Sequence, residues 1–77
     1  MALRHIGTDP GSEGGSCPTV WVDDTTGEVV VQGWLPGPEM LVQAKATGPI
    51  PPSEAVVRLP ARMASMIRKA CDDAERA

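Results

Sequence analysis

Aromatic residues are nearly absent from this chain of 77 residues, which has two tryptophans, no phenylalanine and no tyrosine. The hydrophobic share is an ordinary 42%, and valine, alanine and other aliphatic residues supply most of it. A chain this short buries only about 60% of the surface that its unfolded form exposes. We therefore expect a single small domain with an aliphatic core and marginal stability.

Side chains that react at neutral pH are equally scarce, since the chain has one histidine and two cysteines. His5 lies in a segment where nothing is expected to hold it within hydrogen-bond reach of any other group, so a Cys/His catalytic pair is not expected. A structural zinc site needs four ligands at suitable spacing, which two distant cysteines and one histidine do not provide. The sequence therefore predicts no enzyme, no cofactor and no metal site.

The chain has fewer basic residues (7) than acidic ones (10), which gives a net charge of −3. Such a charge repels phosphate backbones and does not attract an anionic membrane. Residues 1–7 lack the apolar run of a secretory signal, and no segment approaches the roughly 20 apolar residues of a membrane span. We expect a cytoplasmic protein that binds neither nucleic acid directly nor a membrane.

The amino-terminal segment has little that could pack. Residues 7–16 contain no large apolar side chain, so burial cannot offset the entropy that is lost when they become ordered. We predict a flexible tail over residues 1–16 and a single small α+β domain over residues 17–77.

Two valine-rich runs, TVWVD and EVVVQ, flank a polar turn at residues 24–27 and predict a β-hairpin. With Gly27 at positive φ, Val22 faces Val29. A slip by one residue would mix valine with aspartate and glutamine on each face, so we favour the first register. It gathers four valines on one face: Val20, Val22, Val29 and Val31.

The opposite face of the hairpin would carry the indoles, which are the largest apolar surfaces of the chain. We expect the segment after the hairpin to fold back and cover them, because isolated hairpins are unstable and large exposed apolar patches are rare. The alternative is that this face stays open as a docking surface for a protein. Its candidate partner-binding residues are Trp21, Val30, Gln32 and Trp34.

The next segment mixes helix and strand signals. Pro38 suits the first helical position and Glu39 and Lys45 suit the first and last turns, which predicts a short helix over residues 38–46. The apolar run MLV within it is equally compatible with a strand. Residues 54–59 alternate between apolar and polar side chains and predict a third strand, antiparallel to one strand of the hairpin.

Residues 60–77 have the periodicity of an amphipathic helix, with an apolar stripe that we expect to pack on the valine sheet. Three basic residues of the opposite, wet side, namely Arg62, Arg68 and Lys69, are candidate contacts for an acidic partner, although a mixed solvated surface is the simpler interpretation. The stripe comprises Met63, Met66, Ile67, Ala70, Ala74 and Ala77, with Cys71 at its edge. The wet side comprises Arg62, Ser65, Arg68, Lys69, Asp72, Asp73, Glu75 and Arg76.

The two cysteines, Cys17 and Cys71, are expected to be free thiols because no secretion signal accompanies them. Cys71 lies on the seam of the helix and is expected to pack as a small residue. Cys17 precedes Pro18 at the entrance of a strand and is the more reactive of the two. A thiol-based redox or metal sensor that uses both cysteines is the alternative function.

The pattern CPT-x-x-x…VVVQGW…IP…E-x-VV-x-LP, between residues 17 and 60, resembles that of small actinobacterial proteins, especially those of streptomycetes. Small acidic proteins of this kind resemble the accessory proteins that accompany helix-turn-helix regulators. The resemblance therefore implies an accessory role in regulation. We therefore predict a non-enzymatic interaction module that binds another protein, with such a regulator as the candidate partner, either as a monomer or as a homodimer.

Overall fold

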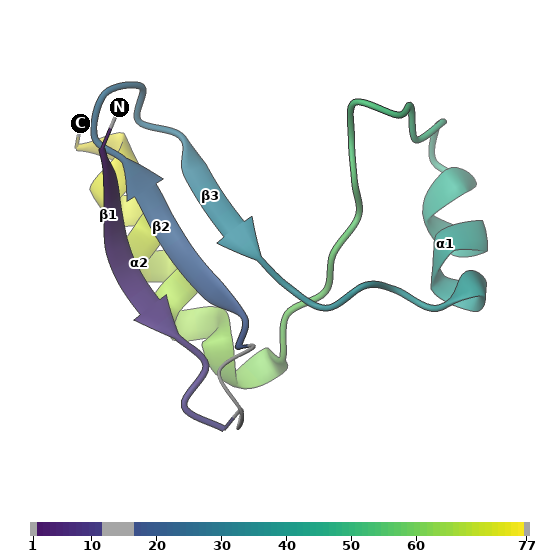
Figure 1. Cartoon of the computed structure of the whole chain (residues 1–77), viewed down its shortest axis with the longest axis horizontal. Helices are drawn as coiled ribbons and strands as arrows, with labels where there is room; N and C mark the ends of the chain where they lie inside the picture. Colours follow the sequence, from purple (N-terminus) through teal and green to yellow (C-terminus); the bar gives the residue numbers. More distant parts are fainter. Residues whose placement is uncertain (1, 12–16, 77) are drawn as a thin grey trace.

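The computed structural model describes residues 2–11 and 17–76. Three strands form one antiparallel sheet in the order β1-β2-β3, and the carboxy-terminal helix α2 packs on one of its faces (Figure 1). This confirms the predicted α+β class. The elements are β1 (Leu3–Thr8), β2 (Thr19–Asp23), β3 (Val29–Gln32), α1 (Pro38–Lys45), the single 3₁₀ turn η1 (Ala61–Met63) and α2 (Ala64–Glu75).

The hairpin of β2 and β3 has the predicted register. Val22 pairs with Val29 and Val20 with Val31. The backbone N–H of Asp23 donates to the carbonyl oxygen of Glu28 at 2.9 Å. The turn ends at Gly27 with φ 79°, a conformation that costs a residue with a Cβ more than it costs glycine.

The core lies between α2 and the sheet. Its buried hydrophobic residues are Val20, Val22, Met63 and Ala70. The small side chain of Ala70 allows α2 to lie close to the valines of β2. Five half-buried residues pack around this centre: Ile6, Leu59, Met66, Ile67 and Ala74. The predicted stripe of the helix is thus confirmed for its described members, and Ala77 lies outside the described residues.

The third strand comes from residues 3–8 and not from residues 54–59. In β1, Leu3 pairs with Asp23 and Thr8 with Thr19. The assignment of these residues to a flexible tail is therefore wrong, because pairing with β2 satisfies their backbone and Ile6 packs against the core. Residues 12–16, which we also placed in the tail, lie outside the described residues.

Residues 54–59 do not form the predicted strand. They meet the sheet at one bridge beyond the end of β3, where the Trp34 N–H donates to the Arg58 carbonyl and the Arg58 N–H to the Trp34 carbonyl, both at 2.9 Å. Both edges of β2 are occupied, by β1 and by β3, so this segment cannot pair with β2. Of the alternating apolar residues in this segment, Ala55 is exposed, whereas Val57 and Leu59 are half-buried.

The segment that mixed helix and strand signals is a helix, α1, with Pro38 in its first turn and Ala46 as its C-cap. None of its residues is buried, and within the described part of the chain it contacts no other helix or strand. In Figure 1 it lies to the right, well away from the sheet. It therefore does not fold back over the indoles as we expected. We call residues 35–57 the arm, because they leave and rejoin the domain at the Trp34–Arg58 bridge.

Within residues 2–11 and 17–76, no helix combines the length and the apolar character that crossing a bilayer requires.

Candidate functional site

The face of the sheet that points away from α2, which we call the outer face, is built by the alternation of side chains along the strands. Trp21 pairs with His5 on β1 and with Val30 on β3, and residues that pair directly share a face. Leu3, two positions before His5, lies on the same side. Trp21 and Val30 are half-buried, and Leu3 and His5 are exposed. Figure 1 shows α2 behind the sheet, and no described helix or strand crosses in front of it.

Gln32 joins this face at one end. It follows Val30 by two positions, and its Nε2 donates to the carbonyl oxygen of Cys17 at 2.9 Å. The structure therefore brings together three of the four residues predicted for the indole face, namely Trp21, Val30 and Gln32.

The fourth residue, Trp34, is engaged within the chain. The guanidinium carbon of Arg58 lies 5.2 Å from the centroid of its ring, within the range of a cation–π interaction. The Arg58 Nε also donates to the Leu35 carbonyl at 3.2 Å. Together with the backbone bridge, these contacts make Trp34 the anchor at the base of the arm, a role that the sequence did not indicate.

His5 is also held more firmly than we predicted. Its Nε2 lies 2.8 Å from the Thr8 hydroxyl, which lies 3.2 Å from the Thr19 hydroxyl. The Thr19 hydroxyl donates to the Cys17 carbonyl at 2.9 Å. The expectation that nothing would hold His5 is therefore wrong, because β1 is a strand and places the imidazole beside these hydroxyl groups.

Three large apolar side chains of the arm are exposed, whereas Leu41, Ile50, Val56 and Val57 are half-buried. Leu35 is 79% exposed, Val42 69% and Met40 45%. Met40 and Val42 belong to α1, and Leu35 precedes it. This helix has no side-chain hydrogen bond at its N-cap, Gly37. An isolated helix of this length is marginal in water, because most helix stability in proteins comes from tertiary packing. The arm is thus an apolar segment that the domain itself does not support.

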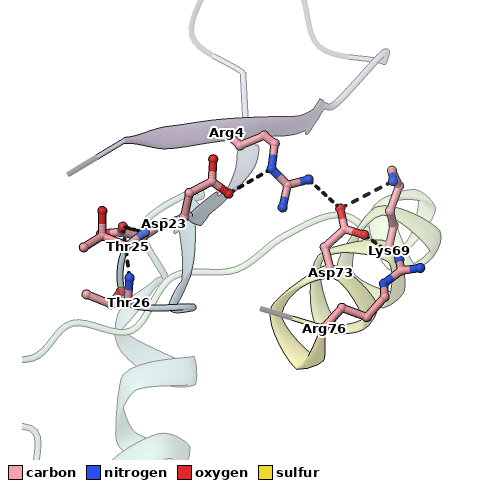
Figure 2. Close-up of polar contacts among 8 residues, drawn as sticks. Arg4, Asp23, Thr25, Thr26, Lys69, Asp73 and Arg76 are labelled. Carbon is pink, nitrogen blue, oxygen red and sulfur yellow. Dashed lines mark hydrogen bonds and ion pairs between the residues drawn. The ribbon is translucent and has the colours of Figure 1, made fainter.

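A polar cluster between β1 and α2 is centred on Asp73 (Figure 2). The Arg4 Nη1 lies 3.0 Å and the Lys69 Nζ 3.4 Å from Asp73 Oδ2, and the Arg76 Nη2 lies 2.7 Å from Asp73 Oδ1. The Nε of Arg4 lies 3.0 Å from the Oδ1 of Asp24. A shallow pocket of about 360 Å³ opens here, lined by Arg4, Asp24, Asp73 and Arg76. Its charged groups are paired with one another, so the cluster connects α2 to β1 and to the hairpin turn.

The position of Asp73 corrects our assignment of this residue to the wet side of the helix, since it is only 8% exposed. It follows Ala70 by three positions and Met66 by seven, which puts it on the packed face. Burial tends to raise the pKa of Asp73, but hydrogen bonds from Arg4 and Arg76 outweigh it and hold that pKa below the ordinary 3.8. Hydrogen bonds to Asp24 and Asp73 raise the pKa of Arg4.

A second ion pair ties the loop after β1 to η1. The Arg62 Nε lies 2.6 Å from Asp9 Oδ1 and the Arg62 Nη2 lies 2.7 Å from Asp9 Oδ2, a bidentate arrangement. The hydrogen bond to Asp9 raises the pKa of Arg62. Two of the three basic residues proposed as partner contacts, Arg62 and Lys69, thus have acidic partners within the chain. Arg68 is exposed on α2.

Cys17 and Cys71 are both free thiols. Cys17 is half-buried, whereas Cys71 is exposed and does not pack on the seam as we expected. Its place at the edge of the apolar stripe puts it beyond the cover of the sheet. Among the described residues, no three His, Cys, Asp or Glu side chains lie close enough to hold a metal ion. The thiol-sensor alternative stays a prediction.

The described chain therefore offers an outer face with a half-buried indole and an arm with unsupported apolar side chains. Comparisons with profiles of known protein families, with curated proteins and with solved structures found no match for this chain.

Proposed function

We propose that this chain is a protein-interaction module that acts by docking its arm on another protein and catalyses no reaction of its own. The observation that carries the proposal is α1, a helix of eight residues that buries none of its side chains. Since such a short helix is marginal without packing, a surface on another molecule would supply the support that the domain does not.

The exposed side chains of the arm define the chemistry of the partner. Leu35, Met40 and Val42 offer apolar contacts, and methionine adapts well to irregular surfaces. The helix carries one acid, Glu39, and one base, Lys45, so it has no charge preference. An apolar groove on a folded protein, which binds a short helix along its length, fits these properties.

We propose further that this partner is a cytoplasmic helix-turn-helix regulator. The resemblance to small actinobacterial companions of such regulators supports this class. Charge supports it as well, because DNA-binding proteins carry basic surfaces and this chain has a net charge of −3. Opposite charges speed the encounter of two proteins and add specificity to it.

Affinity capture from a streptomycete extract tests this proposal, with the full chain as bait and quantitative mass spectrometry as the readout. We expect Leu35→Glu and Val42→Glu to lower the recovery of one regulator at least tenfold, about 1.4 kcal/mol of binding free energy. The fold should persist, because the side chains of Leu35 and Val42 are both largely exposed.

The matched control is Ser65→Glu, which adds the same charge at an exposed position of α2. It should capture the regulator as well as the unchanged chain does. Capture that falls equally in the control and in the arm variants, or that recovers no helix-turn-helix regulator, contradicts the proposal.

A further inference from the structure

The outer edge of β3 has backbone groups with no partner strand in the described sheet, where β3 is the last member of the order β1-β2-β3. The Asp23 N–H donates to the Glu28 carbonyl, and residues of an antiparallel strand turn alternately toward and away from their neighbour. The N–H and C=O groups of Val29 and Val31 therefore point away from β2.

The side chains at this edge are only partly covered. Val29 is 39% and Val31 41% exposed, although their cross-strand partners Val22 and Val20 are fully buried. All four valines lie on the face that α2 covers, but α2 lies mainly over β1 and β2 (Figure 1). The apolar layer of the sheet thus extends beyond the helix that covers it.

The opposite edge of the sheet is built differently. The pairing of β1 is interrupted by a bulge between His5 and Gly7, and Arg4 carries a charge. Bulges and charged side chains are the features that prevent edge strands from pairing with other chains. β3 has a regular ladder with three valines and one glutamine, and it contains neither a charge nor a proline.

We propose that two copies of this chain form a symmetric dimer in which β3 pairs antiparallel with β3 of the second copy and completes a six-stranded sheet. With the two-fold axis at Val30, Val29 lies opposite Val31 of the second copy, and Glu28 lies opposite Gln32 of the second copy. The outward backbone groups then bond to one another, valine packs on valine and no like charges face each other.

Other registers fit less well. A shift by one residue would set outward backbone groups against inward ones, and a shift by two would leave part of the strand unpaired. A short edge buries little area, and interfaces below about 1,200 Å² are typical of transient complexes. The dimer therefore assembles at high protein concentration. It does not depend on the docking of the arm, and its test uses different variants.

Sedimentation velocity of the full chain, at concentrations up to about 1 mM, the weak end of specific association, tests the dimer directly. We expect a concentration-dependent dimer that Val31→Lys weakens at least tenfold, because the lysine puts a charge on the pairing edge. Val42→Lys, which adds the same charge to the arm, should leave the dimer unchanged. A chain that is monomeric at the highest concentration, or a dimer weakened by Val42→Lys and not by Val31→Lys, overturns the proposal.

A cysteine cross-link provides a second test that does not depend on how Val31→Lys folds. In a background with Cys17→Ser and Cys71→Ser, Val30→Cys should form disulfide-linked dimers on mild oxidation. Non-hydrogen-bonded pairs of an antiparallel ladder lie about 4.5 Å apart at Cα, which a disulfide can span. The control is Val42→Cys in the same background. Equal rates of cross-linking in the two variants would indicate random collision and would contradict the two-fold axis at Val30.

Discussion

The two α-helices in the described part of the chain show that good end signals and good packing are separate properties. α1 has a proline in its first turn, an acid in the first turn and a base in the last, and yet it buries nothing. α2 has no side-chain cap, no acid in its first turn and no base in its last, and yet it packs on the sheet. End signals determine where a helix begins and ends, whereas a continuous apolar stripe determines whether it belongs to the core.

Two ion-pair groups add to the support of α2 and have no counterpart in α1 among the described residues. Asp9 and Arg62 tie the start of the helical segment to the loop after β1, and Arg4 and Asp73 tie its last turns to β1 itself. The part of the chain that packs is therefore held at both ends, and the arm is held only at its base.

The largest expected effect on stability comes from comparing a methionine of the packed part of the chain with a methionine of the arm. Met63→Ala should lower the free energy of unfolding by about 2–5 kcal/mol, because it empties a fully buried position. Met40→Ala, in α1, should change it by less than about 0.5 kcal/mol. Urea unfolding followed by tryptophan fluorescence measures both values. Equal losses would mean that α1 is part of the folding unit.

Two glycines give the next comparison. A Cβ at Gly7 would lie 2.7 Å from the sulfur of Met66, so Gly7→Ala should cost about 1 kcal/mol as the flexible Met66 side chain moves aside. A Cβ at Gly37, before α1, would meet nothing within 4 Å, and Gly37→Ala should leave the thermal unfolding of the domain nearly unchanged, because none of the residues of α1 is buried. Thermal unfolding monitored by circular dichroism distinguishes the two.

Asp73→Asn should lower the urea midpoint of unfolding more than Asp72→Asn does, because Asp72 is the exposed neighbour of Asp73. The loss should be smaller than that of Met63→Ala, since solvent screens the exposed basic partners of Asp73. A midpoint that responds equally to both changes would show that the cluster around Asp73 contributes nothing specific.

The same carboxyl group makes stability depend on pH. Because the pKa of Asp73 is lower in the folded chain than its ordinary 3.8, the unfolded chain binds more protons in this range. The stabilisation is fully present above the ordinary value and is lost as the pH falls through the folded value. The difference in urea midpoint between the unchanged chain and Asp73→Asn should therefore narrow with acidification below 3.8. A constant difference would contradict this assignment.

The smallest effect is expected in the arm. Gln43→Gly should reduce the helical signal in circular dichroism, because glycine costs a helix about 1 kcal/mol relative to its best residues, but it should leave the urea midpoint unchanged. Ser65→Gly in α2 should lower that midpoint measurably. A change of midpoint for Gln43→Gly would show that α1 unfolds together with the sheet.

Local pattern was sufficient for several features. The register that sets Val22 against Val29, the turn at Gly27 and the apolar stripe of the carboxy-terminal helix all follow from neighbouring residues, whereas residues 38–46 fit both a helix and a strand. Pairing of Trp21 with Val30 on one face of the sheet follows from the same register. The buried position of Asp73 could have been predicted in the same way, because its spacing from Ala70 and Met66 places it on the packed face of α2.

Tertiary structure alone decided which segment becomes the third strand and where the arm goes. The sequence determined the hairpin and the carboxy-terminal helix, because the periodicity of side chains and the turn residues act over a few positions. The choice of β1 over residues 54–59 depends on which distant segment reaches the edge of β2, with Ile6 in the core and Arg4 beside Asp73. Such contacts join residues far apart in the chain, so their free energy appears only when the whole domain has come together.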